Sequence, residues 1–144
     1  MNDPRINKLA GLLVRYCIGA RAGQTVGVSG NMAAEPLLAA LYAELLDAGA
    51  FPVLQMMPDG LSEIFFTRGK RRHFATLTRY QKAYAASVDA TIRVQSENNT
   101  RLLSGVDPAK QILFARTMAP AAEALSRKPW VITLFPTAAY AQDA

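Results

Sequence analysis

The stretch "QTVGVSGNMAAEPLLAALYAELLDAGAFPVLQMM", residues 24–57, places an Ala- and Leu-rich segment between two short apolar runs. Residues 24–30 and 51–57 have the length and composition of buried strands, and residues 31–50 have the composition of a helix. Gly49 is suited to end that helix, because glycine readily adopts the left-handed conformation that follows many helices. A strand, a helix and a second strand in this order predict a βαβ unit with parallel strands.

The same alternation continues toward the C-terminus. "DATIRVQS" (residues 89–96) and "PWVITLF" (residues 129–135) predict a third and a fourth strand, each preceded by helical segments. Short apolar strands that alternate with helices are typical of a parallel sheet with both faces covered. The predicted fold is therefore a single α/β domain over residues 1–144, with three layers, α/β/α, and a mostly parallel sheet.

Two of the predicted helices have clear starting signals. Asp3 and Asp107 can cap helices, and Pro4 and Pro108 fit the first helical turn. Pro120 is expected to kink or split the helix that starts at Pro108. Residues 136–144 start a further helix that has barely begun at Ala144, so the chain is expected to be an engineered fragment, a proteolytic product or the product of a truncated gene. The segments with helical patterns are residues 4–20, 31–50, 59–69, 70–87 and 107–128.

The N-terminal segment has apolar side chains at spacings of three and four, which predicts one buried helix face. Cys17, the only cysteine, falls in this pattern and is expected to be a small core residue rather than a nucleophile. Charged residues interrupt the segment, so neither a signal peptide nor a transmembrane span is predicted and the expected location is the cytoplasm. The apolar residues of this face are Ile6, Leu9, Leu12, Leu13, Tyr16 and Cys17.

The chain is moderately basic. Its 144 residues carry a formal net charge of +5, and 51% of them are hydrophobic, which is typical of one globular domain. The basic segment Arg68–His73 could contact nucleic acid, but no RRM, KH or helix-turn-helix signature accompanies it. A solvated helix face explains the segment better, so no nucleic-acid partner is predicted.

The usual motifs of catalytic and cofactor sites are missing from the sequence. His73 is the only histidine and lies among cations, whereas a catalytic zinc site needs several converging ligands. The strand–glycine–helix junction at Gly30 and Asn31 lacks both GxGxxG and GxxxxGK[ST], so these residues are interpreted as a turn and a cap. Ser104 lies outside any GxSxG motif. No catalytic or metal-binding residue is therefore predicted in this chain.

The connection "SENNTRLLSGVDPAKQ", residues 96–111, is unusually polar. Its second half is explained as the start of a helix. Asn98, Asn99, Thr100 and Arg101, in its first half, would follow a strand at its carboxyl end. In open α/β sheets that edge is where ligands and partners bind, and the fork of Arg101 suits a carboxylate. Two interpretations remain: a contact with another domain or the edge of a cleft, or an Asn-capped turn with Arg101 paired to a local acid.

Five segments in order give the chain a resemblance to a known family. "ENNTRLLSGVDPAKQ" (97–111) is similar to a characteristic segment of the thermophilic-type metalloaminopeptidases, peptidase family M29, which includes aminopeptidase T and aminopeptidase S. The extra Asn in "ENNTR" and the basic segment after residue 67 depart from the family pattern. The other matching segments are "DPRINKLAGLLVRYC" (3–17), "AAEPLLAALYAELLDAGAFPVL" (33–54), "VDATIRV" (88–94) and "TLFPTAAYAQDA" (133–144).

The resemblance implies a longer parent protein with a C-terminal catalytic domain. Two divalent metal ions, zinc or cobalt, would be bound in that domain by Glu, His and Asp residues, and the parent would remove N-terminal residues from peptides as a homodimer. None of those ligand positions falls in this sequence. The chain is therefore expected to be an inactive N-terminal domain; the alternative is a free-standing α/β binding or protein-interaction module.

Overall fold

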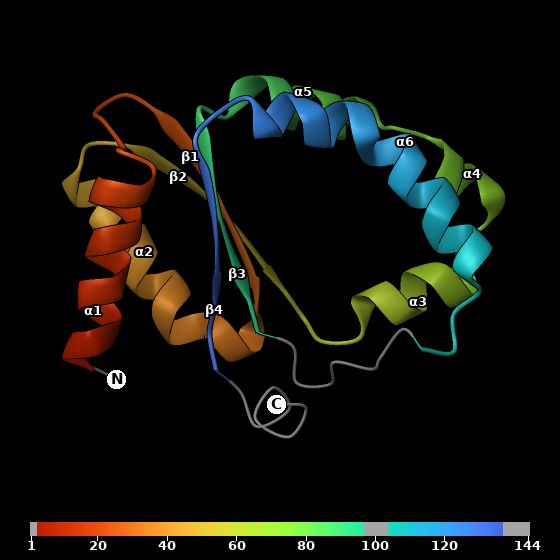
Figure 1. Cartoon of the computed structure of the whole chain (residues 1–144), viewed down its shortest axis with the longest axis horizontal. Helices are drawn as coiled ribbons and strands as arrows, with labels where there is room; N and C mark the ends of the chain where they lie inside the picture. The colour runs from red at the N-terminus through yellow and green to blue at the C-terminus, as the bar shows by residue number, and fades with distance from the viewer. Residues whose placement is uncertain (1–2, 97–103, 137–144) are drawn as a thin grey trace.

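The computed structural model describes residues 3–96 and 104–136, in which strands and helices alternate as predicted (Figure 1). The elements, in chain order, are α1 (Pro4–Gly11), the π-helical η1 (Leu12–Cys17), β1 (Thr25–Asn31), the 3-10 turn η2 (Met32–Ala34), α2 (Glu35–Asp47), β2 (Phe51–Met57), α3 (Leu61–Arg68), α4 (Arg71–Ala75), α5 (Arg79–Ser87), β3 (Ala90–Gln95), α6 (Pro108–Ser126) and β4 (Trp130–Leu134).

The four strands form one sheet in the order β2-β1-β3-β4, and every pair is parallel. Figure 1 shows α1 and α2 on one side of the sheet and α3 to α6 on the other. The architecture is therefore the predicted three-layer α/β/α fold. Because the chain leaves β1 toward β2 on one side and β3 lies on the other side of β1, the strand order reverses between β1 and β3.

The hydrophobic core lies between the sheet and the layer of α1, η1 and α2. Leu37, Leu38, Leu41 and Leu45 of α2 are at most 1% exposed. Their spacing of three and four residues places them on one helix face, and that face packs on the inner side chains of the strands. The strands contribute Val26, Val28, Ala90, Ile92 and Val94 to this core.

The other face of the sheet is covered less completely, contrary to the prediction that both faces are buried. Helix α6 has no buried residue along its whole length. On β4, Trp130, Ile132 and Leu134 are 54%, 44% and 58% exposed. The second helical layer instead has a small cluster of its own, in which α3, α4 and α6 pack through Phe65, Phe66, Phe74, Val106, Leu113 and Phe114.

The N-terminal helix buries only part of the predicted face. Leu13 is buried and Ile6 and Leu9 pack against the core, but Leu12, Tyr16 and Cys17 are exposed. Its last turns are π-helical, and the N–H of Ile18 bonds to the carbonyl of Leu13, five residues earlier. A π-helix has more residues per turn than an α-helix, so side chains four apart, as in Ala10, Val14 and Ile18, stay on the buried side. Cys17 is exposed, so its prediction as a core residue was wrong.

The capping predictions are confirmed at two helices. Asp3 accepts a hydrogen bond from the Arg5 N–H at 2.9 Å, and Asp107 accepts one from the Ala109 N–H at 2.9 Å. Gly49 follows α2 with a φ of 79°. Of the two outcomes predicted at Pro120, a split does not occur, because Pro120 lies inside the single helix α6.

Candidate functional site

The carboxyl ends of β1 and β3 meet where the strand order reverses, which is the usual ligand-binding edge of an open parallel sheet. Here the Ser96 hydroxyl, at the end of β3, donates a hydrogen bond to the side-chain oxygen of Asn31, at the end of β1. Asn31 therefore joins two strands instead of capping the helix that follows it. Ser96 is 1% exposed, so this polar pair is part of the structure of the edge rather than an open binding group.

The site residues predicted from the sequence come after the end of β3 in the chain. Asn98, Asn99, Thr100 and Arg101 follow Ser96 and Glu97 in the sequence and are outside the described residues. Their proposed role as interdomain or cleft-edge contacts therefore stays a prediction.

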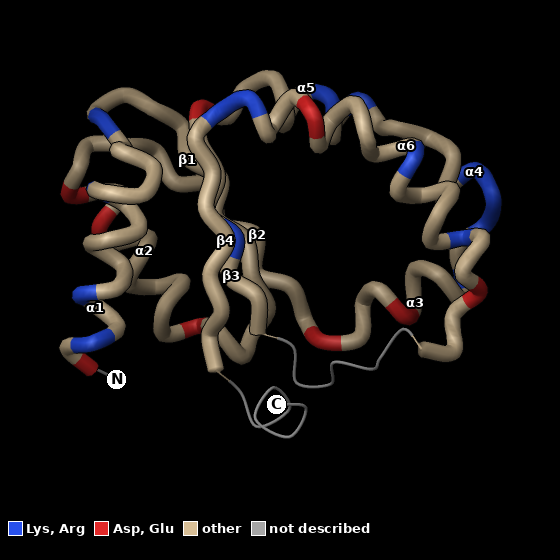
Figure 2. Tube along the Cα trace, viewed as in Figure 1, with Lys and Arg blue, Asp and Glu red and all other residues tan. Residues whose placement is uncertain are grey.

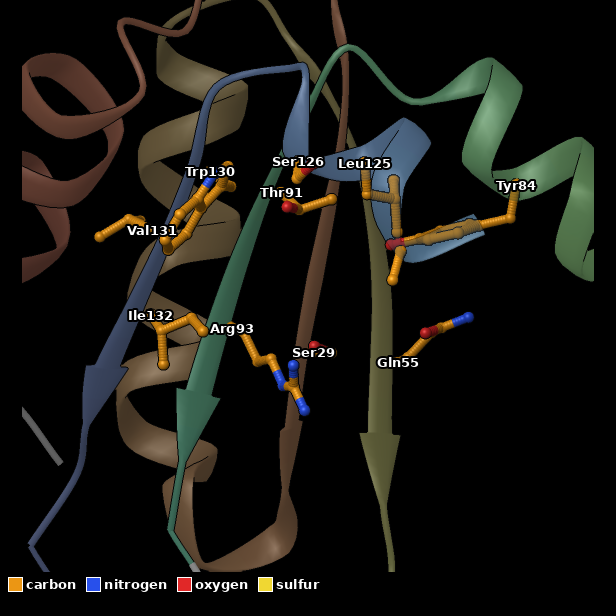
Figure 3. Close-up of a pocket in the computed structure, with 11 residues that line it drawn as sticks. Ser29, Gln55, Tyr84, Thr91, Arg93, Leu125, Ser126, Trp130, Val131 and Ile132 are labelled. Carbon is orange, nitrogen blue, oxygen red and sulfur yellow. The ribbon is translucent and has the colours of Figure 1, made fainter. Parts of the chain in front are cut away.

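A pocket of about 370 Å³ lies on the less covered face of the sheet, between the strands and the helices α5 and α6 (Figure 3). Paired residues of parallel strands point to the same face, so the register defines two rows of residues on the face of the sheet that carries the pocket. One row is Gln55–Ser29–Arg93–Ile132, and the other is Val53–Gly27–Thr91–Trp130. The pocket thus brings together residues from all four strands.

The helical wall of the pocket is held in place from two sides. Lys128, just after α6, donates hydrogen bonds to the backbone carbonyls of Ala85, Ala86 and Val88 at 2.7, 3.2 and 2.6 Å. A cation at the C-terminus of α5 also interacts favourably with the helix dipole. On the opposite side, Tyr84 of α5 reaches the sheet beside Gly27, where any side chain would overlap its hydroxyl group.

The pocket combines polar groups with an apolar wall. Burial, followed in importance by the neighbouring Tyr80, raises the pKa of the Tyr84 hydroxyl above its ordinary value. Gln55 donates a hydrogen bond to the Tyr80 hydroxyl at 3.1 Å. Figure 3 shows Arg93 extending from β3 across the sheet face toward Ser29.

Sequence reasoning missed this pocket, although the strand "TIRVQ" contained a signal. Thr91, Arg93 and Gln95 alternate with Ile92 and Val94, which is the pattern of a strand with one polar face. The segment was interpreted as a strand with both faces buried, because the surrounding βαβ pattern favours that arrangement. The helical wall could not be foreseen, since it depends on how α5 and α6 pack.

The residues that the structure describes do not form a metal site. No group of three or more His, Cys, Asp or Glu side chains among them is arranged to hold a metal ion. His73 is exposed, and its Nδ1 accepts a hydrogen bond from the Lys70 N–H at 2.8 Å at the start of α4. Figure 2 shows Lys and Arg gathered around α4, at the far end of the second helical layer from the sheet. His73 and the cations around it therefore do not fit a catalytic metal centre.

Comparison with known families identifies the domain. The family profile described as thermophilic metalloprotease (M29) matches residues 2–144. The chain belongs to the M29 family. This confirms the resemblance found from the five sequence segments. None of the curated proteins compared with the chain matches it.

A solved structure has the same fold as this M29 chain. Wild-type AmpT from Thermus thermophilus superimposes with a TM-score of 0.73 at 20% sequence identity. The match covers 93% of this chain but only 36% of AmpT. The shared fold therefore accounts for about a third of the larger protein's length.

Within residues 3–96 and 104–136, no helix is both long and apolar enough to cross a membrane.

Proposed function

We propose that this chain is the N-terminal, non-catalytic domain of a metal-dependent aminopeptidase that removes N-terminal residues from peptides. Two findings together carry the proposal. The family profile matches residues 2–144, but the structural match covers only 36% of the length of AmpT. A metalloprotease family member needs metal ligands, and the described residues contain no suitable cluster. The catalytic metal site would then belong to a C-terminal domain of a longer parent.

The parent would use two divalent metal ions, zinc or cobalt. Such ions supply a metal-activated water and polarise the scissile carbonyl. The role of this domain would be architectural: it would pack against the catalytic domain and limit access of the peptide. Exposed apolar side chains on this side of the sheet that lie outside the pocket, Leu134 of β4 and Ile112 of α6, support a covering partner there. The parent is expected to act in the cytoplasm.

The reading frame beyond Ala144 tests this proposal. We expect it to continue and to encode clustered His, Glu and Asp residues, and the longer product to release the chromophore from an amino-acid anilide when zinc or cobalt is added. We also expect this product to sediment as a homodimer. A stop codon directly after Ala144, together with a stable 144-residue product in cells, would contradict the proposal and support a free-standing binding module.

A further inference from the structure

The pocket beneath α5 and α6 contains a cation that is not neutralised within the described chain. Arg93 is exposed, and none of residues 3–96 and 104–136 forms a salt bridge with it. Its neighbours in the register are Ser29 on one side and Ile132 on the other, neither of which carries charge. The paired N–H groups of the guanidinium therefore remain free to bind an anion, and their geometry fits a carboxylate.

The polar groups around Arg93 suit the same kind of ligand. The Ser29 hydroxyl lies next to Arg93 in the sheet, and the Tyr84 hydroxyl lies beside Gly27 on the same face. Both groups can donate hydrogen bonds to an oxygen anion. Gln55 is already partly engaged, because it donates to Tyr80.

The rest of the lining is apolar and partly open. Trp130 and Ile132 are 54% and 44% exposed on the floor, and Leu125 of α6 forms part of the wall. Sites for small molecules typically have volumes of about 300–1,000 Å³ and combine apolar walls with a few polar groups that orient the ligand. The volume of about 370 Å³ is at the lower end of that range.

We infer that this pocket binds a small organic monocarboxylate whose carboxylate pairs with Arg93 and whose apolar group lies against Trp130. The alternative is that Arg93 interacts only with solvent and binds no ligand. The inference is independent of the proposed peptidase activity, because it requires neither metal ions nor a catalytic domain.

A fluorescence titration of the 144-residue chain tests the inference directly. Trp130 is the only tryptophan, so its emission reports on the pocket. We expect N-acetyl-leucine to change the emission in a saturable way in the millimolar range. N-acetyl-leucinamide, which has the same apolar group without the charge, should bind about ten-fold more weakly or worse, because hydrogen bonds to charged groups are the strong ones. Both compounds have blocked amino groups, so neither tests aminopeptidase activity.

Two substitutions separate a specific site from general charge attraction. Arg93→Gln should weaken binding of N-acetyl-leucine about ten-fold or more and leave N-acetyl-leucinamide unaffected, and Arg93→Lys should bind with intermediate affinity. Arg72→Gln, on the exposed side of α4, is the matched control with the same change of charge and should leave both affinities unchanged. Circular dichroism would verify that the variants are folded. Equal affinity for the acid and the amide, no loss in Arg93→Gln, or no saturation at tens of millimolar would overturn the inference.

Discussion

Replacing Leu41 with alanine is expected to lower the free energy of unfolding by about 2–5 kcal/mol, the usual cost of a large-to-small change at a fully buried site. Leu41 is 0% exposed and lies in the middle of the α2 face that packs on the sheet. The neighbouring leucines are also buried, so the surroundings have little room to collapse into the cavity. Urea unfolding followed by circular dichroism measures the change.

The matched control lies on the same helix. Leu46 is 54% exposed, so Leu46→Ala removes the same atoms from a position that is mostly in water. We expect this change to alter the free energy of unfolding by less than about 1 kcal/mol. Equal losses of unfolding free energy for Leu41→Ala and Leu46→Ala would show that α2 does not pack on the sheet through the face that contains Leu41.

Replacing Gly27 with alanine is expected to cost about 1–3 kcal/mol of unfolding free energy, because it adds volume where none is available. An added Cβ would overlap the Tyr84 hydroxyl and lie 2.9 Å from the ring atom Cζ. Tyr84 would have to move, which would disturb the wall of the pocket. Thermal or urea unfolding gives the size of the loss, and Trp130 emission reports the disturbance nearby.

A control and a double variant make the Gly27 prediction specific. Gly105→Ala should have little effect, since its added Cβ would have no atom within 4 Å and its φ is not positive. Tyr84→Leu removes the end of the ring, so Gly27→Ala should cost less in a Tyr84→Leu background than alone. Additive losses would contradict direct contact between Tyr84 and Gly27.

Sequence reasoning predicted the parts of the fold that depend on local patterns. The strand–helix–strand unit of residues 24–57 was readable because Leu37, Leu38, Leu41 and Leu45 repeat with helical spacing. The caps at Asp3 and Asp107 depend on side chains within two residues, so they were also predictable. Parallel pairing followed from the alternation of strands and helices.

The remaining features depend on contacts between distant segments or on irregular backbone. The π-helical turn at Leu12–Cys17 shifts which side chains are buried, and a regular helical period cannot anticipate that shift. Helix α6 continues past Pro120, although local propensity favours a break there. The pocket needs Arg93, Tyr84 and Trp130, which are brought together only when α5, β3 and β4 are assembled.

The aminopeptidase activity of the purified 144-residue chain tests the central claim most directly. The chain would be incubated with a chromogenic amino-acid anilide and either zinc or cobalt, beside samples with a chelator and without protein. We expect no metal-dependent release of the chromophore above the protein-free sample, because the described residues supply no cluster of metal ligands. Metal-dependent turnover that co-purifies with the chain, and that the chelator abolishes, would show that the chain has a catalytic site of its own.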